Sequence, residues 1–213
     1  MHSLDKNECI LYNIDMETRS KYLPQLAAIL EQPLILAKEA EKYGVTRQAL
    51  AYLCKLGLLE RLSDGIYQSV DYEPEVDVAW EQLAIQASII PNAVICLISA
   101  LAYYELTDEI PRENWIAIPN VQRAPVRKGL RVVRMRNIEL GQLGLQLGEY
   151  KVKIYDRERC VVDAFRYLSI EIAIKALRAY IRDSNKRPTI KKITDYAKEL
   201  RVHITPYILS ETT

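Results

Sequence analysis

The stretch KYGVTRQALAYLCKLGLLERLSDGIYQ, residues 42–68, constrains the fold of this chain more than any other segment. Thr46 can cap a helix over residues 47–56, and Gly57 then ends that helix. After the glycine, LLERL and IYQSV are typical of two short strands joined at residues 63–65, where Asp-Gly strongly favours a tight hairpin. The segment therefore predicts a capped helix followed directly by a two-stranded hairpin.

The two sides of this expected helix differ in chemistry. On a wheel of 3.6 residues per turn, its apolar side consists of Ala49, Leu50, Leu53 and Leu56. The opposite side consists of Arg47, Gln48, Ala51, Tyr52 and Lys55. We expect the first side to pack against a core and the second to face solvent or a partner.

Two more helices are expected upstream. Residues 21–30 and 34–43 both have helical patterns, and Gly44 can end the second helix in a left-handed cap. The apolar face of the first consists of Leu23, Leu26, Ala27 and Leu30. Three short helices followed by a hairpin are the plan of a winged helix-turn-helix, which can bind DNA or dock a partner protein.

The residue types on the polar side suit DNA. Arg47 can donate a fork to guanine, Gln48 can bond adenine through both ends of its amide, and Lys55 can meet a phosphate. The predicted DNA-binding residues are Thr46, Arg47, Gln48, Tyr52, Lys55 and, in the hairpin, Arg61. Charge argues the other way, because residues 1–75 carry eight Lys and Arg against twelve Asp and Glu. DNA binding and protein docking therefore both stay open.

A different pattern follows the polar segment VDYEPEVD, residues 70–77. A helix is expected over residues 76–88. AVICLI reads as a buried strand or a helix entry, and Ser99 can cap a helical run over residues 99–106. Further strands are expected over residues 115–119, 129–135 and 150–156, with turns between them at Gly141, Gly144 and Gly148.

The chain ends in four expected helices, which begin after Asp156, Ser169 and Thr189 and at Thr205. The apolar face of the first consists of Val161, Ala164, Phe165 and Leu168. That of the second consists of Ile170, Ile174, Leu177 and Ile181. That of the third consists of Ile190, Ile193, Tyr196, Ala197 and Leu200. The predicted fold class is α+β: an N-terminal winged helix-turn-helix, residues 20–70, then a larger mixed α+β domain, residues 76–213, with a C-terminal helical cluster.

Three stretches, taken in order, resemble the AbiEi family of antitoxins and transcriptional regulators, which belong to type IV toxin–antitoxin systems of abortive infection. They are YGVTRQALAYLCKLGLLERLSDGIYQ, then ISALAYYELTDEIPRENWIAIPN, then IYDRERCVVDAFRY with a later ITDYAKELRV. The resemblance covers roughly residues 20–210. The third helix and the hairpin of this chain are less basic than those of family members often are.

The resemblance implies that the N-terminal domain binds inverted repeats in the promoter of its own operon and represses it. It also implies that the C-terminal domain counteracts a nucleotidyltransferase-like toxin, generally without a stable complex. The expected partners are therefore double-stranded promoter DNA and, functionally, that toxin. The alternative is a protein-interaction module whose winged helix docks a partner protein and binds no DNA.

Neither a catalytic nor a metal or cofactor site is expected, and we predict that the chain is not an enzyme. One acidic cluster consists of Asp156, Glu158 and Asp163. Helical spacing lets Asp163 pair with Arg159 and with Arg166, which predicts structural ion pairs. Residues 149–151 match the Glu-x-Lys of metal-dependent nucleases but lack the aspartate upstream. Four scattered cysteines and two histidines argue against a zinc site.

One basic stretch lies outside the motifs that carry the resemblance. It contains no acid and six basic residues: Arg123, Arg127, Lys128, Arg131, Arg134 and Arg136. One interpretation is a solvated hairpin edge, whose charges discourage aggregation. The other is a second contact with an anion such as a DNA or RNA backbone, comprising Arg127, Lys128, Arg131 and Arg134. Lys151 and Lys153 could lie on a strand beside this stretch.

The composition is typical of a soluble folded protein, with 49% hydrophobic and 27% charged residues. The longest apolar run, residues 93–102, is far shorter than the ~20 residues that cross a bilayer. The N-terminus lacks a basic start followed by an apolar core, which argues against a signal peptide. With a net charge of +1, no global field marks a nucleic-acid binder or a membrane binder. We therefore expect a cytoplasmic protein without a membrane partner.

Overall fold

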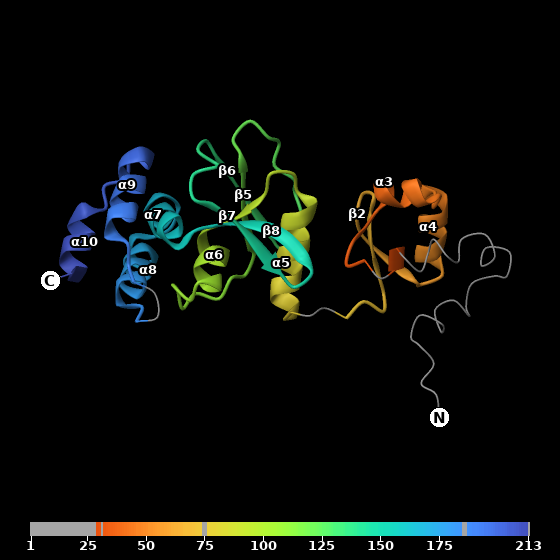
Figure 1. Ribbon diagram of the computed structural model, residues 1–213, viewed down its shortest axis with the longest axis horizontal. Coiled ribbons are helices and arrows are strands. Elements are labelled where there is room, and N and C mark those ends of the chain that lie inside the picture. Colours follow the sequence, from red (N-terminus) through yellow and green to blue (C-terminus); the bar gives the residue numbers. More distant parts are fainter. Residues whose placement is uncertain (1–28, 31, 74–75, 185–186, 213) are drawn as a thin grey trace, which may run out of the picture. The chain divides into compact units, whose positions relative to one another are not determined.

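Figure 1 shows the computed structural model of the chain, which describes residues 29–30, 32–73, 76–184 and 187–212. The chain divides into two compact units, Met1–Glu75 and Val76–Thr213, and the division falls within the polar segment 70–77. The fold is mixed α+β. Most of the first expected helix, residues 21–28, lies outside the described residues, whereas Ile29 and Leu30 are helical and buried.

The first unit contains a small antiparallel sheet and short helices. Its elements are β1 (Ile35–Leu36), α3 (Ala37–Ala40), the 3-10 helix η1 (Glu41–Tyr43), α4 (Arg47–Lys55), β2 (Leu59–Ser63) and β3 (Ile66–Ser69). The strand order is β1-β3-β2. The two-stranded hairpin predicted from the sequence is therefore present, and a third short strand extends it.

The second expected helix begins later than predicted. Ile35 and Leu36 pair with β3 in an extended conformation, so the helix starts only at Ala37. This pairing buries Ile35 completely. Gly44 ends the helical segment with a φ of 79°, the left-handed cap that the sequence predicts. The core of the unit includes Ile35, Ala40, Val45, Leu50, Leu53, Leu59 and Tyr67, whereas η1 contributes no buried residue.

The second unit is built on a five-stranded sheet. Its elements are α5 (Val78–Ile89), β4 (Val94–Ile95), α6 (Leu97–Tyr103), β5 (Asn114–Pro119), β6 (Leu130–Met135), β7 (Gln142–Leu147), β8 (Tyr150–Tyr155), α7 (Arg157–Tyr167), α8 (Ile170–Arg182), α9 (Ile190–Leu200) and α10 (Thr205–Thr212). The strand order is β6-β5-β4-β8-β7. β5 runs parallel to β6, and β4 runs parallel to β8.

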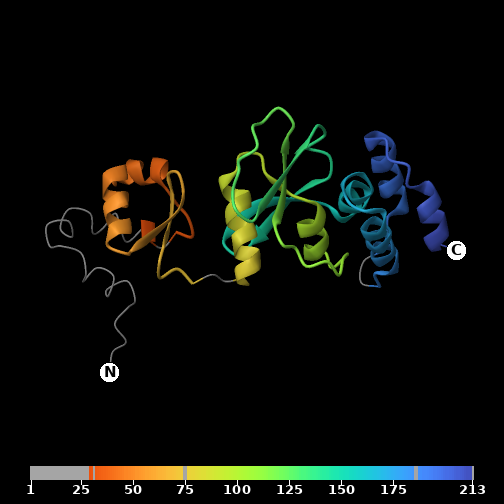
Figure 2. The ribbon, with the colours of Figure 1, turned by 180° about the vertical axis from the view of Figure 1, so that it is seen from behind.

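Helices cover this sheet and extend beyond it. α5 packs against β8 and β5, and α6 packs against β5. Figure 2 shows α5, in yellow, alongside the sheet, and the blue helices at the C-terminal end of the unit. Within that end, α7 packs against α6, α8 and α9, which makes α7 the link between the sheet and the helical cluster.

Two residues of this unit lie elsewhere than the sequence predicts. Ser99 does not cap a helix, because α6 already begins at Leu97; the buried Ser99 hydroxyl instead accepts a hydrogen bond from the Trp115 N–H at 2.9 Å. Gly144 lies inside β7 and not in a turn, whereas Gly141 and Gly148 take positive φ at the two ends of that strand. The strand β7 was not predicted, since its glycines resemble turn residues.

The buried faces of two C-terminal helices also differ from the prediction. α7 is buried on nearly every side, so that Arg159 and Asp163 are as inaccessible as Val161. The buried side of α8 consists of Ala173, Ala176, Leu177 and Tyr180, while Ile170 is exposed. Each helix packs against more than one neighbour, so a single apolar stripe does not describe its surroundings. In α9, Ile193 and Ala197 are buried as predicted.

Candidate nucleic-acid interface

The helix α4 is fixed at its start and along one side. Thr46 Oγ1 accepts a hydrogen bond from the Ala49 N–H at 3.2 Å, which confirms the predicted cap. Leu50 and Leu53 are buried in the core of the first unit. Leu56, which the wheel places on the same side, is instead exposed, because the chain turns away at Gly57 with a φ of 74°. One side of α4 is therefore anchored over its length.

The opposite side of α4 is open to solvent, as predicted. The exposed residues on this side are Arg47, Gln48, Ala51, Tyr52 and Lys55. They combine a guanidinium, an amide, an aromatic ring and an ammonium along about two turns of helix. The packing of its buried side prevents α4 from rotating about its own axis. The polar groups on the opposite side therefore all face solvent, and a partner could contact them without a change in the backbone.

Arg47 and Arg61 each lie beside an acid. Arg47 Nε is 3.4 Å from Oε1 of Glu41, the first residue of η1, and both side chains are more than half exposed. Arg61, on β2, pairs with Asp64 in the hairpin turn, and its Nε also donates to the Ser63 carbonyl at 3.3 Å. Exposed pairs of this kind contribute only about 0–1 kcal/mol, so either arginine can exchange its acid for another anion at little cost.

Arg61 sits at an irregular point of the hairpin. The register between β2 and β3 shifts between Arg61 and Ser63, and Gly65 turns the chain with a φ of 70°. The guanidinium also acts on Cys54 of α4: burial raises the pKa of that thiol, and Arg61 partly offsets the rise.

The basic stretch of the second unit forms the loop before β6 and the strand β6 itself. β6 is an edge strand, but it pairs in parallel with β5, so the expected hairpin is not present. Arg131 lies 4.5 Å above the Trp115 ring, and its Nη1 is 3.6 Å from Glu113 Oε2. Lys128 and Arg134 are exposed. Arg127 is half-buried and has further interactions of its own.

The second group of lysines does not join this stretch. Lys151 and Lys153 lie on β8, and the strands β5 and β4 separate β8 from β6. The structure thus gathers Arg47, Gln48, Tyr52 and Lys55 on one helix face with Arg61 on the adjoining hairpin, while the Arg127–Arg134 group belongs to the other unit.

In the acidic cluster of α7, Asp163 forms the predicted ion pairs with two arginines of the same helix. Asp163 Oδ2 is 2.7 Å from Arg159 Nε, and its Oδ1 is 2.7 Å from Arg166 Nη1. Arg159 is completely buried, and it also donates to the carbonyls of Asn137 and Leu140 at 3.0 and 2.9 Å. The burial of an arginine could not be inferred from sequence, because a helical wheel treats this residue as solvent-facing.

A second set of polar contacts joins α7 to α8 and α9. Lys192 Nζ lies 3.1 Å from Asp156 Oδ2 and 3.0 Å from Glu158 Oε2. Tyr180 donates to Glu158 at 2.7 Å, and Tyr196 donates to Asp156 at 2.8 Å. Burial alone would raise the pKa of Glu158, but the hydrogen bonds from Tyr180 and Lys192 outweigh it and lower this pKa. These contacts hold the three helices together.

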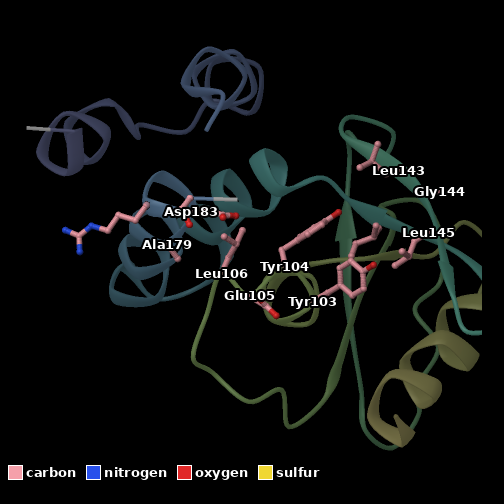
Figure 3. Close-up of a pocket in the computed structure, with 12 residues that line it drawn as sticks. Tyr103, Tyr104, Glu105, Leu106, Leu143, Gly144, Leu145, Ala179 and Asp183 are labelled. Carbon is pink, nitrogen blue, oxygen red and sulfur yellow. The ribbon is translucent and has the colours of Figure 1, made fainter. Parts of the chain in front are cut away.

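The second unit also contains a hollow of about 690 Å³ that sequence reasoning missed (Figure 3). Tyr103, Tyr104 and Glu105 line it from the end of α6, and Leu143 and Leu145 line it from β7. Burial raises the pKa of the Tyr104 hydroxyl. The hydroxyl and carboxylate groups of the lining can hydrogen-bond a polar ligand.

Two further observations concern the part of the chain that the structure describes. Its His, Cys, Asp and Glu side chains form no group of three or more placed to hold a metal ion. No described helix has both the length and the apolar character needed to cross a bilayer. No protein-family model matches the sequence, and no curated protein matches it significantly.

Proposed function

We propose that this chain is the antitoxin of a type IV toxin–antitoxin system and represses its own operon. In this proposal the first unit is a winged helix-turn-helix, with α4 as the recognition helix and the β2–β3 hairpin as the wing. The second unit counteracts a nucleotidyltransferase-like toxin in the cytoplasm. The order and spacing of the motifs shared with the AbiEi family motivate this assignment.

One observation carries the DNA-binding part of the proposal. The polar side of α4 is solvent-exposed and rotationally fixed by the buried Leu50 and Leu53, and it directly precedes a hairpin that carries Arg61. A helix that reads the major groove needs such an exposed and fixed side, because its side chains must meet base edges without reordering the backbone. Arg47 and Gln48 have the donors and acceptors that discriminate guanine and adenine.

Footprinting on the promoter of the chain's own operon tests this part. Replacing Arg47→Ala together with Gln48→Ala should weaken operator binding by about 1–3 kcal/mol for each lost base contact. Because both side chains are exposed, the variant should keep the wild-type far-UV circular dichroism and melting temperature. Lys191→Ala, which removes one exposed charge from α9, serves as the control for charge loss. Unchanged operator protection in the double variant would overturn the assignment of α4.

Rescue of cells that express the cognate toxin tests the second part. The Arg47→Ala, Gln48→Ala variant should lose repression and still restore growth, because the toxin is counteracted by the other unit. If the folded variant loses both activities together, the division of labour between the two units is wrong. This experiment keeps the full chain, so that neither unit has to fold alone.

A specific observation favours a second candidate, a protein-docking module. Arg47 lies beside Glu41, and Arg61 pairs with Asp64, so both arginines of the surface are matched by acids. Such a surface has little net positive charge to attract phosphates. Fluorescence anisotropy with operator and unrelated duplexes at low salt separates the candidates. Absence of binding to either duplex favours docking, whereas preference for the operator favours the repressor.

A further inference from the structure

The two edges of the five-stranded sheet differ in how they are protected. The edge strand β6 carries Arg131 and Arg134, both exposed, and charged side chains of this kind discourage pairing with another strand. The opposite edge strand, β7, has the sequence QLGLQL and contains no charge and no proline. Leu143 is 49% exposed on it. β7 therefore lacks the usual means by which an edge strand avoids a partner.

The hydrogen-bonding groups of β7 alternate in direction. β7 pairs with β8 in antiparallel fashion, and the Asp156 N–H donates to the Gly141 carbonyl at 2.8 Å at one end of this ladder. Residues that bond the neighbouring strand alternate with residues whose N–H and C=O point outward. The outward-pointing set is therefore Gln142, Gly144 and Gln146, of which the Gln142 N–H already donates to the Glu139 carbonyl at 3.3 Å. Among the described residues, none bonds the outward N–H of Gly144 or of Gln146.

Five of the six residues of β7, 142–146, read the same in both directions about Gly144. Residues 142–146 are Gln-Leu-Gly-Leu-Gln. If two copies pair antiparallel about a two-fold axis at Gly144, each Gly144 faces the other, each Gln142 faces Gln146, and each Leu143 faces Leu145. The glycine and glutamine pairs are those with outward-pointing backbone groups, and the leucines occupy the closer, non-hydrogen-bonded positions.

We propose that β7 is a homodimerisation edge, at which two copies of this chain join their sheets antiparallel about Gly144. The match of bonding direction with sequence symmetry singles out a second copy over an unrelated strand. The partner leucine covers the exposed Leu143. The joined five-stranded sheets cannot add a third copy in the same way, because the two-fold contact uses β7 of both chains and leaves the arginine-bearing β6 as the outer edge of each of these sheets.

Space is available at the axis. A side chain at Gly144 would meet nothing within 4 Å, and the hollow of about 690 Å³ opens beside Leu143 and Leu145 (Figure 3). The residue opposite Gly144 on β8 is Lys153, whose side chain is exposed. The absence of a side chain at the axis lets two backbones approach with no steric cost. The pairing uses neither DNA nor α4, so it stands or falls independently of the proposed repressor function.

The test is sedimentation velocity of the full chain without DNA over a concentration series. The wild-type mass should rise from 24.5 kDa toward twice that value as concentration increases. Gly144→Glu should weaken association about tenfold or more, because two carboxylates then meet across the axis. Within one chain the same carboxylate lies opposite Lys153, which favours the fold of the single chain.

Further variants separate charge repulsion at the two-fold axis from a general effect of added charge. Gly144→Lys alone should also associate weakly, whereas an equimolar mixture of the Gly144→Glu and Gly144→Lys chains should recover association. Val126→Glu adds the same charge at a side chain that is 100% exposed outside β7, and it should associate like wild type. Far-UV circular dichroism of each variant confirms that the chain is folded.

Amide hydrogen exchange locates the contact. The N–H groups of Gly144 and Gln146 should become protected as the wild-type concentration rises, while those of Leu143 and Leu145 are already protected by β8. A wild-type chain that stays at 24.5 kDa up to about 1 mM overturns the proposal. So does a dimer whose affinity is unchanged by Gly144→Glu, or one that leaves the exchange of Gly144 unchanged.

Discussion

The helices α4 and α7 begin in the same way and place their arginines in opposite environments. Each is capped by an oxygen that accepts a hydrogen bond from the N–H three residues on, Thr46 to Ala49 at 3.2 Å and Asp156 to Arg159 at 2.7 Å. The Arg47 side chain of α4 is 74% exposed, whereas that of Arg159 in α7 is completely buried. An exposed arginine is available to a partner, while a buried one is committed to the fold.

The cost of losing each arginine should differ accordingly. The Arg159 guanidinium satisfies Asp163 and the carbonyls of Asn137 and Leu140. Its removal leaves those acceptors buried and unpaired. Arg47 contacts Glu41 at the surface, where the loss is small. The comparison therefore predicts that α7 variants change stability and α4 variants change binding.

The largest expected effect is that of Arg159→Ala. We expect it to lower the free energy of unfolding of the second unit by about 3–5 kcal/mol, the cost of breaking a buried ion pair. Urea unfolding followed by tryptophan fluorescence measures this unit selectively, because Trp80 and Trp115 both belong to it. Arg47→Ala should leave this transition unchanged.

A double variant sharpens this first prediction. Arg159→Met with Asp163→Leu removes both charges, and it should recover much of the loss, since apolar replacement of a buried pair is often close to neutral. A loss below about 1 kcal/mol for Arg159→Ala alone would contradict the role given to this network.

Substitutions at two glycines of the second unit, Gly141 and Gly144, offer the next test. Gly141 has a φ of 73°, and an added Cβ would lie 2.9 Å from the Arg159 Cβ. Gly141→Ala should therefore destabilise the second unit by about 2 kcal/mol or more, from left-handed backbone strain and crowding together. Gly144→Ala, where the added Cβ meets nothing, is the matched control and should unfold at or slightly above the wild-type urea midpoint at low protein concentration. Equal midpoints for the two variants would contradict the close approach at Gly141.

Acid should weaken the contacts that Glu158 of α7 makes with Tyr180 and Lys192. The folded-state pKa of Glu158 is lowered by its net interactions, so its contribution to stability is present above the unfolded value of about 4.3. That contribution is lost as pH falls through the lower, folded-state pKa. Glu158→Gln should therefore flatten the acid limb of a plot of urea midpoint against pH. The exposed Glu139→Gln is the control, and an acid limb flattened equally by both variants would exclude Glu158 as its source.

The smallest expected effect concerns the exposed charges. If Arg47, Lys55 and Arg61 each neutralise a phosphate, the slope of log affinity against log salt is roughly −3. If DNA also contacts the basic stretch, the slope of log affinity against log salt should be steeper. The double variant Lys128→Gln, Arg134→Gln should then flatten this slope by about 0.9 for each residue. Arg131→Gln should change it less, since Trp115 and Glu113 already engage that guanidinium. A slope unaffected by the double variant would assign the stretch to a solvated edge.

Local chemistry predicted much of the first unit and less of the second. The cap at Thr46, the turn at Gly44 and the hairpin around Gly65 follow from residue preferences within a few positions. β1 escaped prediction because a strand of two residues has no measurable alternation. β7 escaped because Gly144 resembles a turn residue when its partner strand is unknown.

For the candidate sites, too, the sequence predicts what local chemistry determines and misses what depends on distant parts of the chain. The solvent-facing side of α4 follows from a helical wheel, since a single core fixes it. The burial of Arg159 depends on the carbonyls of a loop some twenty positions away, and sequence spacing contains no such information. Likewise, the separation of β6 from Lys151 depends on strand order, which is a property of the whole sheet.

The strand order β6-β5-β4-β8-β7 also determines when each part of the chain can fold during synthesis on the ribosome. The first unit can close once β3 has emerged, because β1, β2 and β3 lie within residues 35–69. The central strand β4 must wait for β8, since Ile95 pairs with Ile154. At about 5–20 residues per second, several seconds separate these two residues during translation. Throughout that interval Val94 and Ile95 lack one neighbouring strand, which makes the half-made sheet, and not the N-terminal unit, the stage at which a nascent chain needs a chaperone.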